Sequence, residues 1–163
     1  MATWTATIVL IALAAIHIGE ETLAGFRGFL NTKWFDGTED CPVSRLKGVV
    51  VDKIGLFLGI AVFALAGALF DGRWILVALG IVTTDIVQHA IFSAAKRGYT
   101  PGVATSALYL ASVVWFFAQP QLRGLVDGPL AWVALAAGAA VIMGNYLLAQ
   151  RKVRRGDCQP APA

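Results

Sequence analysis

The sequence predicts an all-α membrane protein, a single domain of five transmembrane helices spanning residues 1–155. Two observations carry this prediction. The chain of 163 residues is 58% hydrophobic and 14% charged, with a mean hydropathy of +0.71, which is too apolar for a soluble domain of this size. Apolar segments of roughly 17 to 23 residues also recur five times, each about long enough to cross a hydrocarbon core of ~30 Å.

The five segments follow one another along the chain. The first, residues 3–23, has no basic start and no small-residue cleavage site, so we expect it to stay in the mature protein. The others lie at 48–70, 74–95, 101–119 and 129–150, and Gly, Pro and Asp mark turns in the three short connections between them. The connection at 24–47 mixes aromatic and basic side chains, which predicts an interfacial segment or a lid. Residues 156–163 predict a disordered tail.

Basic residues predict the orientation. With the N-terminus outside and the C-terminus in the cytoplasm, only Arg73 and Arg123 of the 13 Lys and Arg residues lie outside. Four tryptophans then fall near the outer ends of their segments, as an interfacial aromatic belt would: Trp4, Trp74, Trp115 and Trp132. We therefore expect a multi-pass protein of the inner (cytoplasmic) cell membrane.

The net charge of +3 reflects this topology, because the basic residues are spread over loops and tail without the interleaved aromatics of a nucleic-acid surface. The expected partners are the lipid bilayer and a lipophilic small molecule, with no nucleic acid. Cys41 and Cys158 both fall on the cytoplasmic side and form no CxxC pair or other metal-binding spacing.

Ionisable side chains gather at one depth of the predicted bundle. His17, Glu20 and Glu21 stand at the end of the first segment, and their spacings of three and four residues place them on one helix face. Counting 1.5 Å per residue from the outer ends puts His17 at about 20 Å and His89, the other histidine, at about 22 Å. Asp85 lies four residues before His89 and shares its face, as Glu21 shares that of His17.

Polar groups of the other segments reach nearly the same layer. Carboxylates outnumber cations at this depth, and several of them cannot all stay ionised in a medium of low dielectric. Either some are protonated or a cation comes from outside the chain. The predicted catalytic set is His17, Glu20, Glu21, Asp85, His89 and Asn145. The predicted substrate-binding set is Asp52, Tyr99, Thr105, Ser106 and Tyr109.

Two motifs resemble those of the HXXEE family of small bacterial membrane proteins. The first runs from His17 to Glu21 (HIGEE), and the second, of the form YxPGxxT, runs from Tyr99 to Thr105. The resemblance extends over residues 5–120 and implies no reaction. It implies a shared site made of His17, Glu20, Glu21 and His89. A weaker likeness of plan, without a shared motif, is to the EXPERA group of sterol isomerases and related membrane proteins, in which a few helices enclose a cavity with acids and a histidine.

Three functions stay open at this point. The first is a membrane-embedded enzyme that isomerises or cyclises an isoprenoid- or sterol-like substrate by acid–base chemistry, with Glu20 or Glu21 as the acid. Asp85 and His89 would then stabilise the developing cation and take up the departing proton.

The second function is a metal-dependent hydrolase that binds zinc or another divalent ion. The motif matches neither HExxH nor the ExxH pairs of di-iron bundles. The candidate ligands are His17, Glu20, Glu21, Asp85 and His89. The third is a non-enzymatic small transporter or lipid-binding protein, in which the carboxylates relay protons or bind an amine.

Overall fold

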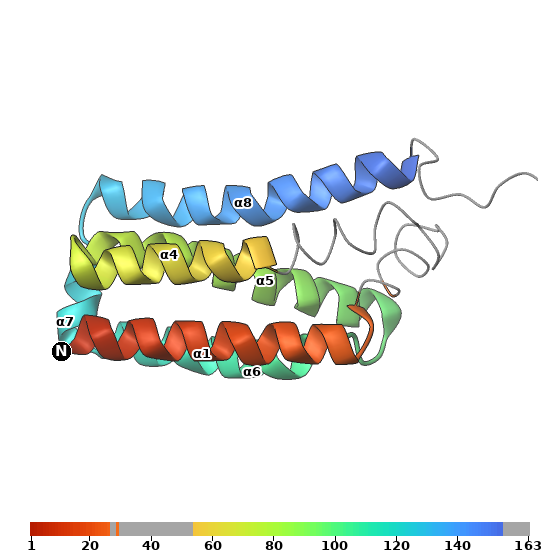
Figure 1. Cartoon of the computed structure of the whole chain (residues 1–163), viewed down its shortest axis with the longest axis horizontal. Helices are drawn as coiled ribbons and strands as arrows, with labels where there is room; N and C mark the ends of the chain where they lie inside the picture. Colours follow the sequence, from red (N-terminus) through yellow and green to blue (C-terminus); the bar gives the residue numbers. More distant parts are fainter. Residues whose placement is uncertain (27–28, 30–53, 155–163) are drawn as a thin grey trace, which may run out of the picture.

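The computed structural model describes residues 1–26, 29 and 54–154, and every regular element in these residues is helical, which confirms the predicted all-α class. The long helices are α1 (Ala2–Leu23), α4 (Gly55–Leu69), α5 (Ile75–Lys96), α6 (Val103–Ala118) and α8 (Pro129–Arg154). Short elements lie between them: η3 (Gly72–Trp74), α7 (Pro120–Arg123) and η4 (Gly124–Val126). The long helices lie side by side, with α1, α5 and α8 running one way and α4 and α6 the other (Figure 1).

Four helices form a ring, and α8 packs on its outside. α1 packs against α4 and α6, and α5 packs against the same two helices, so α1 and α5 face each other across the ring with few direct contacts. α8 packs mainly along α5. α5 is therefore the central helix, and its first eight residues, from Ile75 to Val82, are all buried.

Glycines allow α5 and α8 to approach closely. A Cβ added to Gly138 of α8 would meet the backbone nitrogen of Ile81 at 2.7 Å and the Cα of Gly80 at 2.9 Å. Close backbone approach at small residues gives helices in a bilayer the van der Waals contact that hydrophobic burial cannot supply there. The sequence between residues 129 and 150, rich in Ala and Gly, is suited to this packing.

Three stretches are long and apolar enough to cross a membrane: Ala2–Leu23, Gly72–Lys96 and Pro129–Leu148. α6 reaches that length only with α7 and η4, which follow it after a bend of 88° and begin at Pro120. α4 is apolar but has 15 residues. By length and composition, the described residues thus hold three candidate spans, or four if the bent pair is one span. The predicted second segment begins at 48, outside the described residues.

Polar contacts close the end of the bundle where the chain begins. Asp71 precedes η3, and its carboxylate accepts hydrogen bonds from the backbone N–H of Arg73 at 3.0 Å and from the guanidinium at 2.7 Å. The hydrogen bonds from the Arg73 side chain, followed by the one from its backbone, hold the pKa of the Asp71 carboxyl below its ordinary value. The ionisable residues of the first motif lie toward the opposite end, where α1 ends and α6 begins (Figure 1). Apart from residues 24–26 and 29, the predicted interfacial segment lies outside the described residues, as does the predicted tail.

Candidate metal centre

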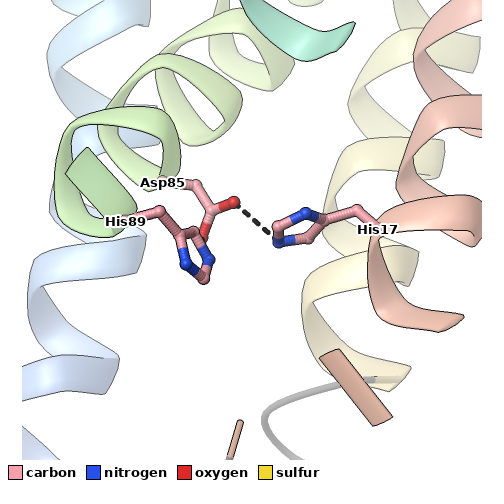
Figure 2. A group of neighbouring side chains, drawn as sticks. All are labelled: His17, Asp85 and His89. Carbon is pink, nitrogen blue, oxygen red and sulfur yellow. Dashed lines mark ion pairs between the residues drawn. The ribbon is translucent and has the colours of Figure 1, made fainter. Parts of the chain in front are cut away.

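Two helices bring two imidazoles and two carboxylates together inside the bundle. His17 and Glu21 lie four residues apart on α1, and Asp85 and His89 lie four residues apart on α5. All four residues are buried, with relative exposures of 1%, 3%, 6% and 0% in the order His17, Glu21, Asp85, His89. Figure 2 shows His17 pointing from α1 across the bundle to Asp85 and His89 of α5. We call these four residues the buried cluster.

The order of the residue types explains how they pair. α1 and α5 run in the same direction, but α1 carries its histidine before its acid and α5 carries its acid before its histidine. Each imidazole therefore meets the carboxylate of the other helix. The Nε2 of His17 lies 2.9 Å from an oxygen of Asp85, and the Nε2 of His89 lies 3.3 Å from an oxygen of Glu21.

The contacts within each helix close the cluster into a ring. The Nε2 of His17 lies 3.7 Å from the same Glu21 oxygen, and the Nε2 of His89 lies 3.7 Å from the other oxygen of Asp85. Zinc bound tetrahedrally at 2.0–2.1 Å separates its ligand atoms by about 3.3–3.4 Å. The four distances of 2.9, 3.3, 3.7 and 3.7 Å scatter around that separation. The cluster thus has the donor types of a divalent metal site, and the ligand atoms of His17, Asp85 and His89 lie within 4.8 Å of one another.

Burial leaves polar atoms of this cluster facing one another without conventional hydrogen bonds. Among the residues that the structure describes, the buried Oδ2 of Asp85 and both ring nitrogens of His89 make no hydrogen bond. Buried polar atoms in proteins are satisfied by a hydrogen bond, by water or by an ion. Two buried carboxylates carry two negative charges, which one divalent cation or two protonated imidazoles would neutralise.

Glu20 lies apart from the buried cluster, contrary to the expectation that it shares a ligand with His17 and Glu21. On a helix of 3.6 residues per turn, Glu20 is displaced by about 60° to one side of His17 and Glu21 by about 40° to the other. Different neighbouring helices therefore contact the two acids. Glu20 faces the start of α6 and Glu21 faces α5.

The carboxylate of Glu20 caps the start of α6, where the first backbone N–H groups have no partner within the helix. Its oxygens accept hydrogen bonds from the backbone N–H groups of Gly102 at 3.1 Å, Ala104 at 3.2 Å and Thr105 at 2.8 Å, and from the hydroxyls of Tyr99 at 2.7 Å and Thr105 at 2.5 Å. Tyr99, in the connection before α6, is itself exposed. Its hydrogen bond to Glu20 raises the pKa of the Tyr99 phenol above its ordinary value.

The second motif also contacts the histidines directly. The hydroxyl oxygen of Thr105 lies 2.6 Å from the Nδ1 of His17. Gly102 has a φ of +92° and lies so close that a Cβ there would meet the Nε2 of His89 at 2.7 Å and the Cε1 of His17 at 2.9 Å. Only glycine combines this backbone conformation with so close an approach. The sequence pattern named Gly102 within a motif but gave no sign that it lies against both imidazoles.

The remaining predicted residues are placed less centrally. Tyr109 is buried, and its ring centroid lies 5.2 Å from that of His17. The hydroxyl of Ser106 donates to the carbonyl oxygen of Gly102 at 2.8 Å, a bond within the first turn of α6. Asn145 lies in α8, but its side chain is outside what the structure describes, and Asp52 lies wholly outside it.

An aromatic residue absent from the predicted sets lies over the cluster. The ring of Phe26, just beyond α1, lies 4.8 Å from the ring of His89, and it is buried. Phe92, one turn after His89 on α5, lies 6.1 Å from Phe26. These rings make the surroundings of the His89 imidazole apolar. Nothing in the sequence distinguished Phe26 from the other aromatic residues of the connection at 24–47.

One comparison with known proteins gave a match. A family model described as "Protein of unknown function with HXXEE motif" matches residues 8–116, a stretch that includes the buried cluster and both motifs. No curated protein and no solved structure matches the chain. Because the family model covers most of the chain, this protein belongs to the HXXEE family.

Proposed function

We propose that the protein is a membrane-embedded, metal-dependent hydrolase whose metal ion is held between α1 and α5. The observation that carries the proposal is the buried cluster, in which two imidazole nitrogens lie 2.9–3.7 Å from carboxylate oxygens of Asp85 and Glu21. Imidazole nitrogens mixed with carboxylate oxygens suit zinc, iron or manganese, whereas magnesium and calcium favour oxygen ligands alone.

Three residues of the cluster are proposed as ligands. The ligand atoms of His17, Asp85 and His89 all lie within 4.8 Å of one another. Two imidazoles and one carboxylate leave a fourth position of a tetrahedral site for water, as in catalytic zinc centres. Glu21 is outside this set of ligands, and its oxygen lies 3.3 Å from the Nε2 of His89 and 3.7 Å from the Nε2 of His17.

In the proposed reaction Glu21 is the general base. The ion, if bound by His17, Asp85 and His89, would supply Lewis acidity to a water molecule. Glu21 would take a proton from the attacking water and would return it to the leaving group when the scissile bond breaks. The apolar helices around the cluster favour a lipid-soluble substrate that enters from the bilayer. Tyr109, beside His17, is proposed to contact that substrate.

Acid–base isomerisation of a lipid receives less support from these contacts. That mechanism needs a carboxylic acid free to protonate an alkene or an epoxide. Glu20, one of the two expected acids, accepts five hydrogen bonds at the start of α6, and Glu21 lies against the imidazole of His89.

Metal analysis of purified protein tests the proposal. Because the chain has only two histidines, the protein is purified without a histidine tag from cells grown with zinc, iron or manganese. We expect about one ion per wild-type chain, and loss of the ion in His17→Ala and His89→Ala. Gln88→Ala, next to His89 on α5, is the matched control and should keep the metal. Monodisperse wild-type protein without stoichiometric metal under all three conditions would overturn the proposal.

We further propose the finer topology, with five spans in the inner membrane, the N-terminus outside and the C-terminus in the cytoplasm. The asymmetry of basic residues supports it. Cys41 and Cys158, the only cysteines, are both predicted on the cytoplasmic side. A membrane-impermeant maleimide should label single-cysteine variants in inside-out vesicles but not in intact spheroplasts. Labelling of either cysteine in spheroplasts would contradict this orientation.

A further inference from the structure

Thr105 joins the two sequence motifs through a single oxygen atom. Its hydroxyl lies 2.6 Å from the Nδ1 of His17 and donates to the Glu20 carboxylate at 2.5 Å. The hydroxyl also lies 3.2 Å from the carbonyl oxygen of Gly102, a second acceptor. A hydroxyl has one proton, whereas a carboxylate and a carbonyl can only accept. Two oxygens 2.5 Å apart need a proton between them, so the hydroxyl proton goes to the Glu20 carboxylate. The Thr105 oxygen then acts as acceptor toward His17, and the proton between them belongs to Nδ1.

We propose that Thr105 is a positioning residue that holds His17 in the tautomer protonated at Nδ1 and thereby turns the lone pair of Nε2 toward the buried cluster. The role of this tautomer in metal binding rests on the proposed function, but the tautomer itself does not. In a neutral imidazole one nitrogen is a donor and the other an acceptor, and the partner of one nitrogen determines the state of the other. The Nε2 of His17 is the atom that lies 2.9 Å from Asp85.

Glu20 supplies the rigidity that this role requires. It accepts both the backbone N–H of Thr105, at 2.8 Å, and the Thr105 hydroxyl, so the side chain is held at two points. The result is a chain of hydrogen bonds from a carboxylate through a hydroxyl to a histidine. Metal-binding histidines commonly donate their second N–H to such an outer partner, and loss of that partner typically lowers metal affinity 10- to 100-fold.

Three residues of the second motif then have separate tasks. Tyr99 and Thr105 hold Glu20, and Gly102 gives the chain room to pass the two imidazoles. The first motif divides in the same way. His17 and Glu21 belong to the buried cluster, and Glu20 fixes α1 to the start of α6.

Nitrogen-15 NMR of histidine-labelled protein tests the tautomer directly. Only two rings contribute signals, and a His89→Gln variant assigns them. The measurement is made on metal-free protein after chelation, so it does not depend on the proposed function. We expect Nδ1 of His17 to carry a proton in the wild type and in Thr105→Ser, whether or not Nε2 also carries one toward Asp85, and to lose it in Thr105→Val. Protonation at Nε2 alone in the wild type, or an unchanged spectrum in Thr105→Val, would overturn the inference.

Metal affinity provides the second measurement. If the wild type binds metal, Thr105→Val should raise the dissociation constant 10- to 100-fold, and Thr105→Ser should restore it to within a few-fold. Ser112→Ala removes another buried hydroxyl of α6, which donates to the carbonyl oxygen of Tyr109, and should leave the affinity unchanged. Thr105→Ala takes the place of the valine variant if that variant does not fold. A wild type that binds no metal refutes the proposed hydrolase alone, whereas equal affinities in the wild type and Thr105→Val refute the role of Thr105 in metal binding.

Discussion

Gly102→Ala should disrupt the protein far more than the same substitution in the first motif. A methyl group at Gly102 would lie 2.7 Å from the Nε2 of His89 and 2.9 Å from the Cε1 of His17, well inside van der Waals contact. The backbone φ of +92° adds strain, roughly 1–2 kcal/mol for a residue with a side chain. Overpacking in a buried site costs typically about 1–3 kcal/mol. We therefore expect the free energy of unfolding to fall by about 2–5 kcal/mol.

Gly19 provides the matched control, because it lies in the first motif, within α1, and no atom outside its own helix lies within 4 Å of a Cβ built there. Gly19→Ala should leave stability unchanged or raise it by up to about 1 kcal/mol. Reversible unfolding in mixed micelles with increasing SDS, followed by far-ultraviolet circular dichroism, measures both variants. Gly102→Ala should also lose bound metal, since the imidazoles must move. A change below about 0.5 kcal/mol for Gly102→Ala, with normal metal content, would refute this reasoning.

Three further predictions follow from hydrogen bonds and packing. Glu20→Ala removes a carboxylate that accepts five hydrogen bonds and should lower the free energy of unfolding by about 2–4 kcal/mol in the same SDS titration; a change within error would contradict its role as the cap of α6. The hydrogen bond to Glu20 raises the pKa of the Tyr99 phenol. The stabilisation that this hydrogen bond gives the folded protein is therefore fully present below the unfolded pKa of about 10, and it is lost as pH rises through the higher folded pKa. The difference in free energy of unfolding between wild type and Tyr99→Phe should accordingly be constant below pH ~10 and shrink above it. A difference that grows above pH ~10 would contradict this prediction. Gly138→Val places a side chain against the backbone of α5 and should separate α8 from α5 in cross-linking, whereas Gly144→Val, where a Cβ meets nothing within 4 Å, should not.

The convergence of the two histidines could be predicted from the sequence because a helix is a rod of fixed rise. Counting residues from the outer ends placed His17 and His89 at one level, and the four-residue spacing placed Asp85 beside His89. The structure brings these residues together. Their catalytic roles stay predictions, since proximity alone does not name a reaction.

The separate tasks of Glu20 and Glu21 could not be predicted, because they depend on which helix packs on each side of α1. The sequence gives the angle between the two side chains but not the neighbour that each one meets.

The end of α6 illustrates a second limit. Gly, Pro and Asp predicted turns in the connection after α6, and the chain does bend there by 88°, but the sequence did not predict α7 and η4 within it. Such short helices depend on the packing of residues such as Leu122, which is buried.

The placement of the cluster on two helices that scarcely touch has a consequence for how the protein is assembled. α1 and α5 lie across the ring from each other, and α4 and α6 hold them at the separation that the cluster requires. Helices of membrane proteins insert first and associate afterwards. The residues of the buried cluster lie on α1 and α5, which are synthesised before α6. They would therefore be in the bilayer before Thr105 and the helix end that Glu20 caps. Tight metal binding would then require the complete bundle. An ion bound earlier, by a partly assembled chain, would be held by His17 without its outer partner Thr105 and would be released more readily.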